Sequence, residues 1–186
     1  MKNKLFIIIF SVAFTFFCEA QQIYSLRPSS STIPENSYQK DTNNELGSYE
    51  GTWAGNWNNK TIYITFRKLT YKYDNLFKYY RDYLVGKFKV VDNNGKILFD
   101  NTNVSDEDAK IEGLNFRKYN DRYTLVYIDP SVCLEGSIYI KLMDSSNTKL
   151  EFKFSQTPSV IDKNCPYYNA PEMPEPLPSN IILTKQ

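Results

Sequence analysis

The sequence has no histidine among its 186 residues. Histidine is the commonest general base, the usual partner of a nucleophilic serine or cysteine, and a ligand in most zinc and copper sites. Its absence argues against these kinds of catalytic and metal centre. The sequence also has no glycine-rich loop of the kind that binds phosphates or dinucleotides. We therefore predict no catalytic residue, no metal site and no cofactor, and interpret the chain as a protein that is not an enzyme.

An excess of charge of one sign is also lacking. The chain has 22 Lys and Arg against 21 Asp and Glu. Removing residues 1–20 takes out Lys2, Lys4 and Glu19, so 20 basic and 20 acidic side chains remain. A neutral balance argues against nucleic acid as a partner and against a polybasic membrane anchor. Beyond residue 20 we expect no transmembrane segment, because no later stretch is long and apolar enough.

The first 20 residues have the pattern of a secretory signal peptide. Two lysines precede an uncharged apolar stretch at 5–17, and Cys18 and Ala20 lie three and one residues before Gln21. This order predicts cleavage before Gln21 and export to the periplasm or the medium. We do not expect lipidation of Cys18, because the residue before a lipobox cysteine is small and Phe17 is bulky.

The remaining two cysteines, Cys133 and Cys165, are predicted to form a structural disulfide. They lie 32 residues apart in the sequence, and an exported protein with two cysteines has one intramolecular pairing. The alternative is a pair of free, buried thiols.

Strand patterns dominate the chain after residue 46. Apolar and polar residues alternate at 61–66, 137–142 and 149–154, and the segment 123–128 is nearly continuous in apolar character. Asn93-Asn94-Gly95 indicates a hairpin, and Asn58-Asn59 a tight turn. We predict an all-β fold of about eight to nine mostly antiparallel strands, as a lipocalin-like barrel or a barrel-like sandwich.

The expected organisation has three parts: a signal peptide at 1–20, a flexible N-terminal arm at 21–46 and a single β domain at 47–186. The arm is polar and has few apolar residues that would favour an ordered state. Within the domain, residues 158–178 are rich in proline and predict an extended excursion, followed by a last strand near 181–184. Residues 74–85 also fit a helix, but we favour a strand from about Tyr79 to Val91.

Two resemblances to known families follow from short motifs. Gly51-Thr52-Trp53, with Trp57 after it, resembles the opening of lipocalin-like barrels, and we expect both tryptophans to pack in the core. The segments 82–88, 149–153 and 178–185 together resemble a family of small exported Bacteroidota proteins whose function is unknown. That resemblance implies a bacterial envelope or secreted location and supplies no catalytic residue.

The candidate ligand site lies inside the predicted barrel. We expect an apolar or amphipathic small molecule to contact Phe66, Leu84, Phe88 and Tyr127, since alternation places these side chains on the inner face. The competing interpretation is an interior filled with side chains and no ligand at all.

Tyrosine supports a second function. The chain has 15 tyrosines, and clusters at 71–73, 79–83 and 167–168 would suit a surface module that binds glycans or a partner protein by ring stacking. The alternative is that these rings cover half-buried sheet surface.

Carboxylates support a third, weaker candidate function, that of a hydrolase. A hydrolase would need two of them close together, and Glu112, Glu135 and Glu151 are candidates on predicted strands. The acidic run Asp106-Glu107-Asp108 lacks the spacing of a calcium loop and is interpreted as a solvated loop with Ser105 as a cap.

Overall fold

The computed structural model describes residues 20–27, 32–158 and 163–186. The predicted signal peptide therefore lies outside the described residues, apart from Ala20. No helix among the described residues has both the length and the apolar character needed to cross a membrane. The described residues form one short 3-10 helix and eleven strands: β1 (Ile23–Ser25), β2 (Tyr38–Lys40), η2 (Leu46–Tyr49), β3 (Gly51–Trp57), β4 (Lys60–Asp74), β5 (Tyr79–Asp92), β6 (Ile97–Asp100), β7 (Ile111–Phe116), β8 (Tyr123–Asp129), β9 (Leu134–Leu142), β10 (Lys149–Gln156) and β11 (Asn180–Lys185).

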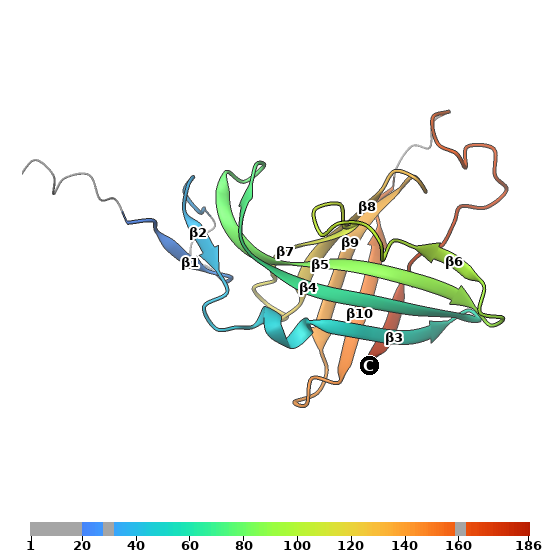
Figure 1. The fold of residues 1–186 in the computed structure, drawn as a ribbon, viewed down its shortest axis with the longest axis horizontal. Coiled ribbons are helices and arrows are strands. Elements are labelled where there is room, and N and C mark those ends of the chain that lie inside the picture. The colour runs from blue at the N-terminus through green and yellow to red at the C-terminus, as the bar shows by residue number, and fades with distance from the viewer. Residues whose placement is uncertain (1–19, 28–31, 159–162) are drawn as a thin grey trace, which may run out of the picture.

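Eight of the strands form a closed antiparallel barrel (Figure 1). Their order around the barrel is β3-β4-β5-β7-β8-β9-β10-β11, and β11 pairs with β3 to complete the ring. This confirms the all-β prediction and, of its two forms, the barrel. The last predicted strand is β11, which closes the sheet.

Local sequence explains how the strands are joined. Asn58 and Asn59, with φ of 42° and 60°, turn the chain between β3 and β4, because asparagine tolerates the left-handed conformation better than most residues. Gly95 does the same between β5 and β6, with φ of 78°. Both predicted turns are therefore present. Residues 74–85 form the end of β4, a turn and the start of β5, so the strand interpretation was correct and the helical alternative was wrong.

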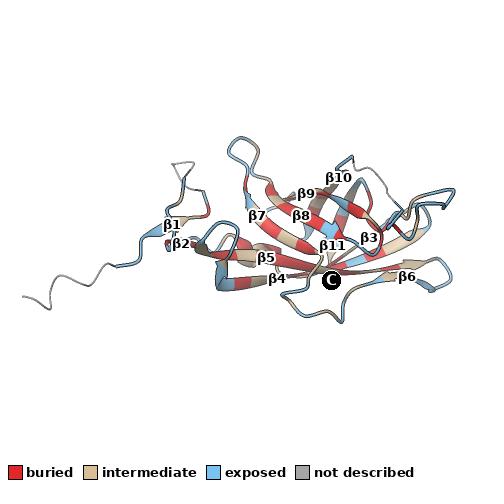
Figure 2. Ribbon diagram, turned by 90° about the horizontal axis from the view of Figure 1, so that it is seen from above, coloured by how far each residue is buried: buried red, intermediate tan, exposed pale blue. Residues whose placement is uncertain are grey.

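The barrel core follows from alternation along the strands (Figure 2). Inward-facing side chains of β4, β5 and β8, such as Ile64, Phe88 and Leu125, are at most 2% exposed. Gly113 on β7 allows the large Tyr123 ring to occupy the interior, because a β-carbon there would collide with the tyrosine hydroxyl. One hydrophobic cluster runs through the whole interior.

Three strands lie outside the barrel (Figure 1). β6 pairs with β5 alone. β4 and β5 extend beyond the barrel wall as a long hairpin, and β2 pairs in parallel with the extended part of β5, with β1 beside it. The described residues of segment 21–46, expected as a flexible arm, thus carry two strands. The described residues 163–179 of the proline-rich segment contain no strand.

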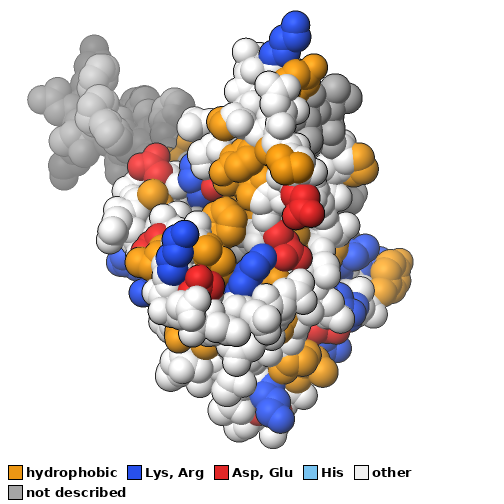
Figure 3. All heavy atoms as spheres, turned by 90° about the vertical axis from the view of Figure 1, so that its right-hand side faces the viewer, with side chains coloured by type: hydrophobic (Ala, Val, Ile, Leu, Met, Phe, Trp, Pro, Cys, Tyr) orange, Lys and Arg blue, Asp and Glu red, His pale blue; other side chains and the backbone are white. Residues whose placement is uncertain are grey.

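The surface carries charges of both signs. Figure 3 views the end of the molecule where β6 and the β3–β4 turn lie, and basic and acidic side chains are interspersed there around a central group of hydrophobic ones. This mixture agrees with the nearly neutral composition.

Buried tyrosines predict a loss of stability at high pH. Burial raises the pKa of Tyr49 to about 12 and raises the pKa values of Tyr123 and Tyr127 further. The unfolded chain releases these protons near pH 10, so stability is complete below about pH 10 and falls as the pH rises toward the folded-state values. We expect part of the tyrosinate absorbance to appear only together with loss of the far-ultraviolet circular dichroism signal.

The control for this titration is a pair of matched variants. Tyr127→Phe should make alkaline unfolding less steep, whereas Tyr119→Phe, at a position that is 90% exposed, should leave it unchanged. A single reversible ionisation of all tyrosines near pH 10 with an unchanged circular dichroism signal would contradict the prediction.

Candidate functional site

The four predicted ligand residues all lie in the barrel interior. Phe66, Leu84, Phe88 and Tyr127 are 0–2% exposed and belong to one hydrophobic cluster. The rings of Phe88 and Tyr127 meet edge to face, with centroids 6.0 Å apart, and the Tyr127 hydroxyl donates to Asp129 at 3.3 Å. Other side chains line the cavities of about 580, 230 and 620 Å³ that lie among the described residues.

The two predicted core tryptophans occupy different environments. Trp53 is fully buried, and its indole N–H donates to the carbonyl oxygen of Tyr49 in η2 at 2.8 Å. The ammonium group of Lys185 lies 5.2 Å from the centroid of the Trp53 ring. Trp57 is half-buried, and Lys60 lies over its ring at 5.3 Å. Trp53 therefore joins η2 to the barrel wall, while Trp57 packs at the edge of the core.

The predicted disulfide is present. Cys133, in the loop between β8 and β9, is bonded to Cys165 in the proline-rich segment, with Cα atoms 5.9 Å apart. The bond attaches the segment that follows β10 to one end of the barrel.

A groove of about 620 Å³ lies between the N-terminal arm and the extended hairpin, and we call it the arm groove. Three separate segments contribute its walls: the arm, the β4–β5 hairpin and the end of β7. Most of the lining side chains are apolar or aromatic. The lining residues are Leu26, Thr32, Ile33, Gln39, Leu76, Phe77, Tyr79, Leu114, Asn115 and Phe116.

Two arginines lie against aromatic rings of the arm groove. The guanidinium of Arg27 is 4.1 Å from the centroid of the Phe116 ring, and that of Arg81 is 5.5 Å from Phe77. Arg27 pairs with Glu45 at 2.8 Å and with Asp121 at 2.7 Å. Its charge is therefore already balanced within the protein.

Arg81 is the more deeply buried of the two, at 1% exposed. It pairs with Asp74 at 2.7 Å and with Glu112, and it donates to the carbonyl oxygen of Gly113 at 2.5 Å. Partial burial raises the pKa of Glu112, and the Arg81 charge opposes that shift. Arg81 thus bridges β5 to β7 where the two strands separate.

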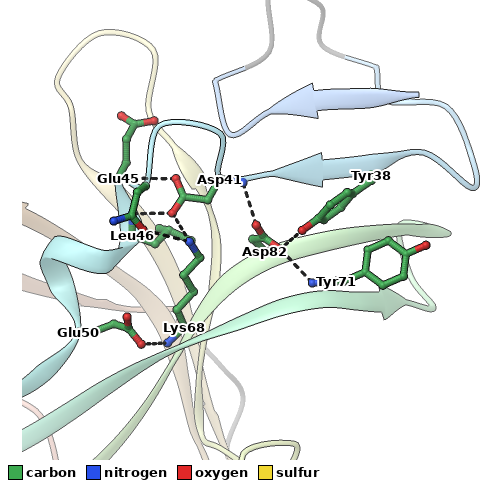
Figure 4. Close-up of polar contacts among 9 residues, drawn as sticks. Tyr38, Asp41, Glu45, Leu46, Glu50, Lys68, Tyr71 and Asp82 are labelled. Carbon is green, nitrogen blue, oxygen red and sulfur yellow. Dashed lines mark hydrogen bonds and ion pairs between the residues drawn. The ribbon is translucent and has the colours of Figure 1, made fainter. Parts of the chain in front are cut away.

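Two buried carboxylates, Asp41 and Asp82, attach the arm to the barrel, and we call them the carboxylate latch (Figure 4). Asp82 accepts hydrogen bonds from the Tyr38 hydroxyl at 2.7 Å, the Tyr71 amide at 2.9 Å and the Asp41 amide at 2.9 Å. It therefore joins β2, β4 and β5 at one point. Burial, with the hydrogen bond to Asp82, raises the pKa of Tyr38.

Asp41 continues the latch toward η2. Its carboxylate accepts from the amides of Glu45 at 2.7 Å and Leu46 at 3.0 Å, and from the Lys68 ammonium at 2.7 Å. The amide of Lys68 in turn donates to Glu50 at 2.8 Å. All four oxygens of the latch accept hydrogen bonds from the protein, which indicates a structural role for both carboxylates.

The carboxylates proposed for hydrolysis do not gather in one cleft. Glu112 pairs with Arg81, Glu151 pairs with Arg122 and Lys153, and Glu135 is exposed on β9. Within the described ranges, no group of three or more metal-ligating side chains lies close enough to hold an ion.

The acidic run between β6 and β7 is a loop, as expected. Asp106 pairs with Arg67 and Lys87 at 2.7 Å each, and Ser105 accepts the amide of Asp108 at 3.2 Å. Two basic side chains of the barrel wall thus pair with Asp106, while Glu107 pairs with Lys72 of the extended hairpin.

Sequence reasoning missed the arm groove and the carboxylate latch. One signal was present: Arg81-Asp82 interrupts the aromatic and apolar run at 79–85, and charged residues that are buried need partners. The identity of those partners, Asp41 and Glu112 among them, depends on contacts between distant segments. Alternation along a strand carries no information about such contacts.

Comparison with known proteins places the whole chain in one family. No curated protein and no solved structure matches it. A family model described as a family of unknown function, DUF6705, matches residues 1–186. This agrees with the part of the resemblance that concerned unknown function. The protein described above, an eight-stranded barrel with a latched N-terminal arm, belongs to family DUF6705.

Proposed function

We propose that this protein is an exported, non-enzymatic barrel that binds a small apolar or amphipathic molecule in the arm groove. The observation that carries the proposal is the groove itself. Its volume of about 620 Å³ falls within the range of roughly 300–1,000 Å³ typical of small-molecule sites. Seven of its ten lining residues are apolar or aromatic, and polar residues such as Gln39 and Asn115 are interspersed among them.

The polar groups of the groove favour an amphipathic ligand. The Gln39 and Asn115 side chains line the groove beside Phe77 and Phe116 and can orient a polar head group. Arg27 and Arg81 are paired with carboxylates, so the groove has little unbalanced charge to attract a free anion. An uncharged or zwitterionic amphiphile suits this lining best.

Export is supported by the N-terminal sequence pattern and by the disulfide. The Cys133–Cys165 bond is of the kind that persists in oxidising compartments. The non-enzymatic part of the proposal is supported by the absence of histidine and by the pairing of Glu112 and Glu151 with basic side chains.

The test is binding of the neutral fluorescent amphiphile N-phenyl-1-naphthylamine to purified residues 21–186. We expect saturable fluorescence enhancement, and we expect Phe77→Ser and Leu114→Ser each to weaken binding about tenfold. Phe77 is 39% exposed and Leu114 is half-buried, so both variants should fold.

Interior variants distinguish the groove from the location predicted by the sequence. Tyr127→Phe and Phe66→Leu change the barrel interior conservatively and should leave the affinity unchanged. If they weaken binding while the groove variants do not, the ligand lies among Phe66, Leu84, Phe88 and Tyr127. If the wild-type protein shows no saturable enhancement, the proposed function is wrong.

A further inference from the structure

Four tyrosines gather on one face of the sheet outside the barrel, and we call them the tyrosine face: Tyr38, Tyr71, Tyr73 and Tyr80. Tyr38 of β2 lies opposite Tyr80 of β5, which lies opposite Tyr73 of β4. Residues directly opposite one another share a face of the sheet, so these three rings form a row across three strands. The Tyr73 and Tyr80 rings meet edge to face at 5.1 Å.

A bulge in β4 adds the fourth ring. The register between β4 and β5 shifts between Leu69 and Lys72, and Tyr71 within this shift has a φ of 51°. That left-handed conformation is unfavourable for a bulky residue and persists only where the surroundings impose it. Bulges often re-aim a side chain beside a functional site.

The carboxylate latch and the arm impose the left-handed backbone conformation on Tyr71. Asp82 accepts the Tyr71 amide at 2.9 Å, and Gln21 accepts the Tyr71 hydroxyl at 3.1 Å. The Tyr71 ring lies flat over Tyr80, with centroids 4.4 Å apart and an interplanar angle of 11°. It is nevertheless 51% exposed. The bulge therefore places a half-exposed aromatic ring on this face. Figure 4 shows Tyr71 beside Tyr38, and the centroids of the two rings are 4.9 Å apart.

A hollow of about 580 Å³ adjoins this face. The neutral side chains of Gln21, Gln22, Asn36 and Ser37 line it, together with the carboxylate of Glu35 and two apolar residues. Gln21 belongs to both features, because it lines the hollow and contacts Tyr71. The rings therefore lie next to amide and hydroxyl groups and next to one carboxylate, Glu35, whose charge is paired with Lys78.

Two lysines of the extended hairpin near this face are paired with carboxylates. Lys78 pairs with Glu35 at 3.0 Å, and Lys72 pairs with Glu107 at 3.2 Å. Both lysine charges are therefore already paired and would attract a polyanion only weakly. A purely apolar partner would cover tyrosine hydroxyls without satisfying them.

We propose that the tyrosine face and the adjoining hollow bind a neutral oligosaccharide. A sugar ring presents apolar C–H groups that stack on Tyr71 and Tyr73, and hydroxyl groups that exchange hydrogen bonds with the amides of the hollow. Asp82 acts as a positioning residue, because it fixes the Tyr71 backbone and does not touch the ligand. This site is separate from the arm groove and does not depend on the function proposed for it.

The experiment is calorimetric titration of residues 21–186 with cellohexaose, maltohexaose, mannohexaose and xylohexaose as probes. We expect at least one to bind, and Tyr71→Ala and Tyr73→Ala each to lower its affinity about tenfold. Tyr119→Ala is the matched control, because Tyr119 is 90% exposed and lies in the turn between β7 and β8, outside the tyrosine face. The affinity of the Tyr119→Ala variant for the saccharide should equal that of the wild type.

Tyr71→Gly separates binding from folding. Both variants lose the ring and its contacts, but glycine adopts a positive φ without strain and alanine does not. Tyr71→Gly should therefore unfold at a higher temperature than Tyr71→Ala and still lose saccharide binding. The proposal is overturned if none of the four hexasaccharides binds the wild type. It is also overturned if Tyr71→Ala and Tyr71→Gly bind as the wild type does, or if the tyrosine face captures a protein partner and no saccharide.

Discussion

Replacing Asp82 with alanine is expected to lower the free energy of unfolding by about 3–5 kcal/mol. The side chain is almost fully buried, and the substitution removes the acceptor for three donors: the Tyr38 hydroxyl and the amides of Asp41 and Tyr71. A hydrogen bond to a charged group contributes about 1.5–3 kcal/mol, and the three are not additive because they share one carboxylate. Each donor left unpaired in the interior adds its own desolvation cost.

The loss of local stability in Asp82→Ala should be concentrated where the arm meets the barrel. We expect urea unfolding to show the lower stability, and hydrogen exchange to show its location. The amides of Asp41, Leu46 and Tyr71 should exchange much faster, while those of β8 and β9 keep the protection set by global unfolding. This separation follows because Asp82 contacts β2 and the β4 bulge and does not contact the far side of the barrel.

Asp121→Ala is the matched control. Asp121 also pairs with a side chain of the arm, Arg27, but its own side chain is 71% exposed. Exposed pairs contribute about 0–1 kcal/mol, so this variant should behave almost as the wild type. If Asp82→Ala were no more destabilised than Asp121→Ala, the latch would not hold the arm.

The strands and turns of the barrel could be predicted because their causes are local. In β10, Leu150 and Phe152 face the core and Glu151 and Lys153 face solvent, and this period of two fixes both the strand and its orientation. Asn58-Asn59 determines a tight turn by its own backbone preference. The disulfide was predictable for a different reason, since only one pairing of two cysteines exists.

The order of the strands around the barrel was harder to predict from the sequence. The hairpin at Asn93-Asn94-Gly95 predicts correctly that β6 pairs with β5, but β6 is not a barrel strand. β7 pairs with β5 at Val85 and Gly86 and takes the place in the wall. Gly86 permits this close approach, because a β-carbon there would lie 3.0 Å from Ile111 and from Phe66. Neighbouring residues in the sequence do not encode that choice.

The arm shows why the candidate sites lay beyond sequence reasoning. Residues 21–46 are polar and have little apolar surface of their own, yet Asp41 and Leu46 are buried. Their order depends on Asp82 and Lys68, which lie 41 and 27 residues further along the chain. The arm forms one wall of the arm groove and contributes Tyr38 to the tyrosine face, so both features depend on where the arm is held. Their composition was visible in the sequence, but their assembly was not.

Removing the Cys133–Cys165 disulfide is expected to lower the free energy of unfolding by roughly 3–4 kcal/mol. The bond closes a loop of 32 residues, and in the chain-entropy model this restriction of the unfolded state accounts for that amount. The double variant Cys133→Ser/Cys165→Ser avoids an unpaired thiol, and urea unfolding with and without dithiothreitol provides the measurement. The reductant should lower the wild-type midpoint to that of the variant and leave the variant unchanged.

The barrel itself should survive the loss of the bond, because the chain after β10 has other attachments. Leu177 is 2% exposed in the core, and Glu175 pairs with Lys60 at 2.9 Å. The segment around Cys165 should therefore become sensitive to trypsin at Lys163 while β11 stays paired with β3 and β10. A double variant with unchanged stability would mean that the proline-rich segment is held by those contacts alone. Complete unfolding of the variant would mean that the bond is required to close the barrel.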